Sequence, residues 1–170
     1  EVTIKGPGVD LHSGEFGGPA VNPIKALSKV LAAMYDQRGR VAIPGFYDGV
    51  KAPPPEVRKA WANLNFPIKR YLGEVGLSVP AGENDFTGLE QMWARPTAEI
   101  NGIYGGYRGI GTKTVIPAEA TAKLSFRLVG GQNPKNVRKV FRDFVSAHLP
   151  KDCRARYITQ AGDSSGITVS

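Results

Sequence analysis

The strongest constraint on the fold is an alternation of two amphipathic helical segments with short strand-like segments. Asn22-Pro23 and Asn133-Pro134 each put an N-capping side chain directly before a proline, which is a typical start of a helix. Apolar residues then recur at spacings of three and four, as far as Gly39 in the first segment and His148 in the second. Each helix therefore has one apolar face, and the fold must supply a surface that covers both faces.

Strand-like segments on either side of these helices can supply that surface. Apolar and polar residues alternate at Val2–Ile4, moderately over 98–104, cleanly over 120–128, and again at 156–159. The resulting order is strand, helix, strand, strand, helix, strand. This order is typical of a ferredoxin-like split βαβ unit. We predict an α+β fold, βαββαβ, with a four-stranded antiparallel sheet and two helices on one of its faces.

Residues 44–97 interrupt that pattern and are expected to form a helical insertion. The stretch contains the triple proline Pro53-Pro54-Pro55, followed by short helical patterns over 56–64, 68–75 and 86–93. At 170 residues the chain is long enough for one ordinary domain and too short for two. We therefore expect residues 1–170 to form a single domain that carries this insertion.

The composition excludes several classes of protein. Apolar residues make up 41% and charged residues 22% of the chain, which is typical of folded globular domains. No apolar run approaches the roughly 18 residues that a membrane span needs. A single cysteine, Cys153, forms no internal disulfide, and two histidines without metal-ligand spacing do not make a zinc site. We expect no metal ligand set in this chain.

The net charge of +7 keeps a nucleic-acid alternative open. Much of the excess lies in the second helix and after it, and residues 135–142 form a basic helical face. A stand-alone ferredoxin-like module could contact nucleic acid through that face. RNA-binding modules of similar topology stack bases on aromatic residues of the central strands. Here Leu124, Phe126 and Leu128 are expected to face the core, which favours a solvated helix face instead.

Two polar residues have both a structural and a functional interpretation. His12 lies in a glycine-dense loop between a strand and a helix, a place where function is commonly carried, but it could also simply bond nearby backbone. Arg127 is expected on the outer face of a regular strand. It is either an ordinary surface arginine or a guanidinium that binds a carboxylate with two hydrogen bonds.

Five runs of residues resemble the lid domain of M20 metallopeptidases, in particular the carnosinase-like dipeptidase branch. Their order covers nearly the whole chain. The runs are DLHSGEFGG (10–18), RPT (95–97), NGIYGGY (101–107), GTKTVIPA (111–118) and KLSFRLV (123–129). The resemblance implies a lid and dimerisation domain cut from a longer zinc-dependent enzyme that hydrolyses dipeptides or related amides. In this family two zinc ions and a glutamate general base belong to a separate catalytic domain, so the chain alone is expected to be inactive.

The resemblance also implies roles for three residues. His12 is expected to reach across the dimer and bond the scissile carbonyl oxygen as it becomes an oxyanion. Thr114 is expected to contact the substrate, and Arg127 to bind the substrate's C-terminal carboxylate. We expect the three to be exposed on a common side. The alternative within the same family is a purely structural dimerisation domain in which His12 has no catalytic part.

The implied partners are a second copy, the catalytic domain and a small peptide, with neither nucleic acid nor membrane among them. The resemblance implies a homodimer through an edge strand at 98–104 and the helix at 22–38. The carnosinase branch has a further substrate-binding histidine after the last strand, where this chain reads Gln160-Ala161-Gly162-Asp163. That departure puts the dipeptide specificity of the branch in question. The sequence shows no signal or membrane segment, so we expect a cytoplasmic location.

Overall fold

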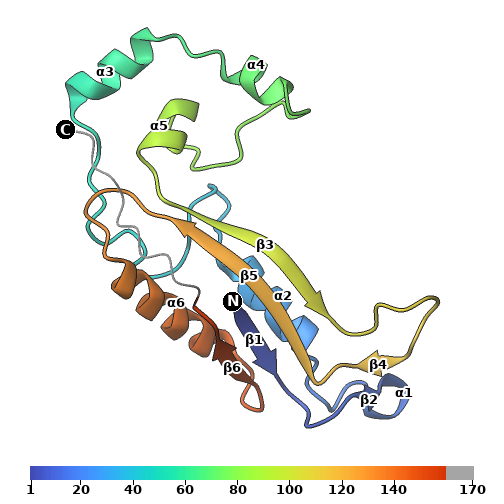
Figure 1. The fold of residues 1–170 in the computed structure, drawn as a ribbon. Helices are drawn as coiled ribbons and strands as arrows, with labels where there is room; N and C mark the ends of the chain where they lie inside the picture. Colours follow the sequence, from blue (N-terminus) through green and yellow to red (C-terminus); the bar gives the residue numbers. More distant parts are fainter. Residues whose placement is uncertain (160–170) are drawn as a thin grey trace.

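A computed structural model describes residues 1–159 as a mixed α/β fold built on a four-stranded antiparallel sheet (Figure 1). The strands lie in the order β3-β5-β1-β6. The two central strands are β5 (Glu119–Arg127) and β1 (Val2–Lys5), and the edges are β3 (Thr97–Gly105) and β6 (Arg154–Tyr157). The last strand begins two residues earlier than its alternation predicts, because Lys5 pairs with Arg154.

The two predicted helices begin where the Asn-Pro pairs place them. In α2 (Pro23–Ala33) the side chain of Asn22 accepts hydrogen bonds from two backbone amides, and in α6 (Pro134–His148) Asn133 accepts one. The first helix ends five residues before the expected residue 38. The chain turns back there, because Ala42 N–H donates to the Met34 carbonyl at 2.7 Å. A tertiary bond therefore replaces the last helical turn.

One face of the sheet carries the hydrophobic core. The buried side chains of α2 and α6 form a single cluster with the inward residues of the strands. Residues paired across antiparallel strands share a face, so Val2 with Ala122 and Ile4 with Ala120 define the core side. The next residues along the strands, Thr3 and Thr121, lie on the opposite face and bond to each other at 2.9 Å. The predicted arrangement of two helices against one face of the sheet is confirmed.

Three short helices lie between residues 44 and 97. They are α3 (Pro55–Asn63), α4 (Ile68–Gly73) and α5 (Gly88–Trp93). Figure 1 shows them beyond the end of the sheet at which β3 begins. Several large apolar side chains in this region are exposed, among them Val75 at 71%.

A second, two-stranded sheet lies at the opposite end of the molecule (Figure 1). It consists of β2 (Leu11–His12) and β4 (Val115–Ile116), and the single-turn helix α1 (Ser13–Phe16) follows β2 directly. The sequence predicts only a loop around His12, because two-residue strands have no periodicity to detect. The pairing of His12 with Val115 fixes that loop against the segment before β5.

Among residues 1–159, no helix combines the length and the hydropathy that crossing a bilayer requires. The segment 160–163, where the family histidine is replaced, lies outside the described residues.

Candidate functional site

The structure brings together two of the three predicted site residues. His12 at the end of β2 and Thr114 just before β4 are both exposed. Their side chains are in direct contact, with 3.1 Å between His12 Nε2 and Thr114 Oγ1. These residues are 102 positions apart in the chain, so only the β2–β4 pairing makes them neighbours.

Several bonds between the two loops hold this pair in place. The Ser13 amide donates to the Thr114 carbonyl at 3.0 Å, which continues the β2–β4 pairing past His12. The Asp10 carboxylate accepts a bond of 2.8 Å from the Ala118 amide. The Gly6 amide donates to the Ala118 carbonyl at 3.0 Å. Both ends of the loop that carries His12 are therefore fixed to the segment that carries Thr114.

Arg127 lies at the other end of the sheet. It is the last residue of β5 and is exposed, whereas Phe126 packs against the core. Figure 1 shows β2 and β4 beside the beginning of β5. The first residue of β5 is Glu119. A strand rises by about 3.3 Å per residue, so the backbone of Arg127 lies roughly 26 Å from that of Glu119.

This separation exceeds the reach of one small substrate. Two residues of fully extended chain span at most roughly 7 Å. All three site residues are exposed, but Arg127 lies at the far end of β5 from the strands beside His12 and Thr114. Within one chain, a dipeptide in contact with His12 and Thr114 does not reach Arg127.

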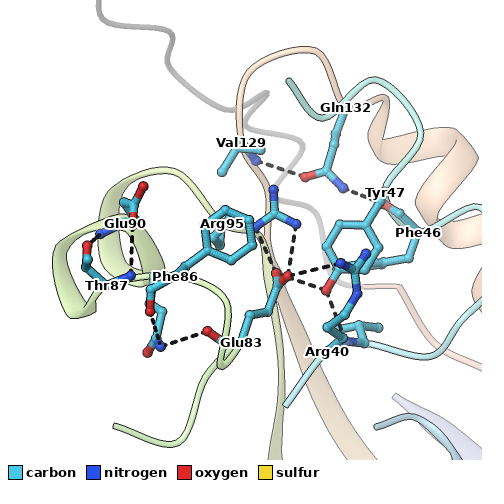
Figure 2. Close-up of polar contacts among 12 residues, drawn as sticks. Arg40, Phe46, Tyr47, Glu83, Phe86, Thr87, Glu90, Arg95, Val129 and Gln132 are labelled. Carbon is cyan, nitrogen blue, oxygen red and sulfur yellow. Dashed lines mark hydrogen bonds and ion pairs between the residues drawn. The ribbon is translucent and has the colours of Figure 1, made fainter. Parts of the chain in front are cut away.

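A second cluster of polar side chains, which the sequence did not predict, connects the region of α5 to the main body (Figure 2). The carboxylate of Glu83 accepts two bonds from Arg95, at 2.9 and 3.0 Å, and a third from the Tyr47 hydroxyl at 3.1 Å. Arg40 lies 3.8 Å from the same carboxylate. The Arg95 guanidinium also lies 4.2 Å from the centre of the Phe86 ring. We refer to Arg40, Tyr47, Glu83, Phe86 and Arg95 as the Glu83 cluster.

Two groups, one in this cluster and one outside it, have shifted pKa values that indicate structural roles. Burial raises the pKa of Tyr47, and the negative charge of Glu83 adds to the effect, so its hydroxyl remains a hydrogen-bond donor. Burial also raises the pKa of the Cys153 thiol, with a further contribution from Asp152. A thiol that stays protonated is a poor nucleophile and a poor metal ligand.

Within residues 1–159, no group of three or more histidine, cysteine or acidic side chains is placed to hold a metal ion. His12 contacts a hydroxyl and a backbone amide, which are not the partners of a metal-bound imidazole. The site is thus a pair of hydrogen-bonding groups on an exposed loop.

The basic face of α6 is partly occupied by contacts within the chain. Lys139 pairs with Asp143 one turn later, with 2.6 Å between Nζ and Oδ2. The Arg142 guanidinium lies 5.2 Å from the centre of the Tyr157 ring. Such contacts are typical of a solvated helix face.

Comparisons with known proteins show to which family the chain is similar. The family described as peptidase dimerisation domain matches residues 1–153. Over 152 residues the chain is 33% identical to the Cys-Gly metallodipeptidase DUG1 of Candida albicans. This match covers 89% of this chain and 30% of the relative. Over 150 residues it is 31% identical to the Beta-Ala-His dipeptidase of Rattus norvegicus, covering 88% of this chain and 30% of that protein.

The fold has a close counterpart in the crystal structure of human carnosine dipeptidase 1. The TM-score is 0.74 at 28% identity, and the match covers 91% of this chain and 34% of that one. The chain therefore spans about a third of the length of the relatives it matches.

Proposed function

The chain belongs to the family of M20 peptidase dimerisation domains, and we propose that it acts as the lid and dimerisation domain of a longer, zinc-dependent dipeptidase. Relatives of known activity are metallodipeptidases, and this chain corresponds to the dimerisation part of such enzymes. The two zinc ions of the proposed enzyme and its general base would lie in the catalytic domain, outside this chain. The chain alone would then have no hydrolytic activity.

In this proposal the His12–Thr114 pair contacts the reacting end of the substrate. His12 donates a hydrogen bond to the scissile carbonyl oxygen as negative charge develops on it, and Thr114 supplies a second polar contact. Exposure of both side chains, on two segments that are hydrogen-bonded to each other, supports this role. A donor held in place before the reaction costs little reorganisation when the charge appears.

Arg127 would bind the C-terminal carboxylate of the same substrate, but from a different copy of the chain. The observation that carries this proposal is the roughly 26 Å that β5 places between the two ends of the sheet. Each active site would take His12 and Thr114 from one copy and Arg127 from the other. This division makes the homodimer necessary for activity.

The remaining features of the proposal concern assembly. The homodimer would form through the edge strand β3 and the helix α2, where Ile103 and Ile24 are exposed. The strand order β3-β5-β1-β6 with two crossing helices supports a ferredoxin-like topology for the domain, with residues 44–97 as an insertion in it. A second copy, the catalytic domain and a small peptide are the proposed partners.

Replacement of His12 by alanine tests the catalytic part of this proposal. In the longer enzyme, His12→Ala should lower kcat by at least about a hundredfold and change KM much less, because one oxyanion donor is worth roughly 10²–10³ in rate. His148→Ala is the control, since that ring contacts the carbonyl and the ring of Phe144 in its own helix α6, away from the His12–Thr114 pair. If kcat of His12→Ala equals that of the control, the domain serves dimerisation alone.

No observation favours the nucleic-acid alternative. Two of the basic residues on α6, Lys139 and Arg142, are engaged with neighbouring side chains, and the apolar residues of β5 pack in the core as expected.

A further inference from the structure

We propose that Gly14 is a positioning residue, whose backbone amide holds the ring of His12 in one orientation with its proton on Nε2. The catalytic consequence rests on the proposed function, because it concerns the same histidine. The orientation and the tautomer rest only on contacts within this chain.

The tautomer follows from the bond that caps α1. His12 is the N-cap residue of this helix, and its Nδ1 atom accepts a hydrogen bond of 3.1 Å from the Gly14 amide. A backbone N–H only donates, so Nδ1 must offer its lone pair and carry no proton. A neutral imidazole has one proton, on one or the other nitrogen. The proton of His12 therefore lies on Nε2.

In the structure, the hydroxyl oxygen of Thr114 accepts a hydrogen bond from this Nε2–H group. Nε2 lies 3.1 Å from Thr114 Oγ1, so the ring donates and the hydroxyl oxygen accepts. The hydroxyl proton of Thr114 then remains available for another acceptor. When a substrate carbonyl oxygen takes the place of Thr114, the same Nε2–H is donated to it. Gly14 thus selects the tautomer that stabilisation of an oxyanion requires, since the opposite tautomer would present a lone pair to negative charge.

Gly14 also leaves the space that the ring occupies. A Cβ atom at this position would lie 2.8 Å from His12 Cε1 and 3.0 Å from Nδ1. Either the ring or the turn would have to shift. Alanine is otherwise favoured over glycine inside a helix, so the expected defect of Gly14→Ala is displacement of the ring and not loss of α1.

Gly8 offers a matched control in the same loop. A Cβ atom built there meets no atom within 4 Å among the described residues. Gly8→Ala therefore makes the same chemical change, a few residues earlier, without contacting His12.

The second histidine of the chain is an internal standard. Nδ1 of His148 lies 2.8 Å from the carbonyl oxygen of Phe144, which only accepts. This ring must carry a proton on Nδ1. The two histidines are therefore expected to show opposite tautomers when both rings are neutral.

Long-range proton–nitrogen correlation spectra of this chain, recorded at about pH 8.5 and well above the ordinary histidine pKa of about 6.5, distinguish the two forms directly. His12→Gln and His148→Gln assign the signals. The expected result is a proton on Nε2 in His12 and on Nδ1 in His148. A proton on Nδ1 of His12, or the tautomer mixture of free histidine, would overturn the proposal.

Variants then separate the roles of Gly14 and Thr114. Gly14→Ala should convert the His12 pattern to a tautomer mixture, while Gly8→Ala leaves it unchanged. Thr114→Val should keep the proton on Nε2 but make it exchange faster with water, and Thr114→Ser should restore slow exchange. An unchanged His12 pattern in Gly14→Ala contradicts the proposal. So does a shift of the proton to Nδ1 in Thr114→Val, which would assign the tautomer to Thr114.

Kinetics of the longer enzyme distinguish failure of this inference from failure of the proposed function. We expect Gly14→Ala to lower kcat by about tenfold or more with little change in KM, since a displacement of about 1 Å can cost as much as roughly a hundredfold. Gly8→Ala should not. If His12→Ala reduces kcat and Gly14→Ala does not, the positioning role fails alone. If the spectra agree but His12→Ala has no effect, the proposed function fails and the positioning stands.

Discussion

At the scale of single residues, Arg127 shows how a regular strand presents a charge at a sheet's surface. Phe126 points into the core, and strand geometry then turns the next side chain to the outer face. A guanidinium is planar and always charged, and its fork of N–H groups matches the two oxygens of a carboxylate. Dipeptides have one free carboxylate beyond the scissile bond, and this is the group that we assign to Arg127.

Arg127→Gln should therefore raise KM for dipeptides by about 10- to 100-fold in the longer enzyme, because a hydrogen bond to a charged group is worth about 1.5–3 kcal/mol. For a dipeptide with an amidated C-terminus, the same substitution should raise KM much less. Steady-state kinetics on both substrates measures the difference. Lys123→Gln, on the same face of β5, is the control. An equal rise of KM for both substrates would show that Arg127 does not bind the carboxylate.

Position in the chain alone made His12 and Arg127 candidates, whereas Thr114 and the role of each residue came only from the family resemblance. The structure adds how the three residues are related. The contact between His12 and Thr114 depends on the pairing of two-residue strands far apart in the chain, for which local patterns carry no signal. The separation of Arg127 from them was also not foreseen. It depends on the length and direction of β5 relative to β4.

At the scale of elements, local signals set where helices begin, and tertiary contacts set much of the rest. Both Asn-Pro starts are correct because an Asn side chain satisfies the first free amides wherever the helix lies. The end of α2 was misplaced because a bond from Ala42 competes for its last turn. The Glu83 cluster joins residues from three separate segments, so no local pattern predicts it.

The Glu83 cluster should contribute strongly to stability. The side chains of Glu83 and Arg95 are 5% and 8% exposed, and removal of one partner leaves a buried charge. Arg95→Met should lower the free energy of unfolding by roughly 3 kcal/mol, measured by urea denaturation. Arg70→Met is the control, because Arg70 is 83% exposed and its pair with Glu74 is worth at most about 0.5 kcal/mol. Similar losses in both variants would contradict a structural role for the cluster.

At the scale of the whole molecule, the sheet has an edge strand that needs a partner or protection. Among residues 1–159, β3 pairs only with β5 and leaves its other side open, which is a template for a second chain. Ile103 on this strand is 60% exposed. Ile100, by contrast, packs against the core, so a charge at Ile100 would damage the fold as well as a dimer. Only the structure distinguishes the two, because a bulge between Ile100 and Gly102 interrupts the alternation.

Ile103→Lys should split the homodimer of the longer enzyme, since it would place a charge in the proposed interface, where Ile103 would be buried. Sedimentation equilibrium measures the mass of the variant and of the unchanged enzyme. Val75→Lys, an exposed site in the insertion, should leave the dimer intact. A dimer that survives Ile103→Lys would place the interface elsewhere.

The central claim is that each active site combines His12 of one copy with Arg127 of the other, and subunit mixing tests it most directly. At substrate concentrations well below KM, the His12→Ala and Arg127→Ala homodimers should each retain about a tenth of wild-type activity or less. In a mixed dimer, one site receives both intact residues and the other receives neither. Equal amounts of the two variants, allowed to exchange subunits, should therefore recover about a quarter of wild-type activity, since about half of the dimers are mixed and each has one intact site. If no activity returns after exchange is complete, both residues act from the same copy, and the account is wrong.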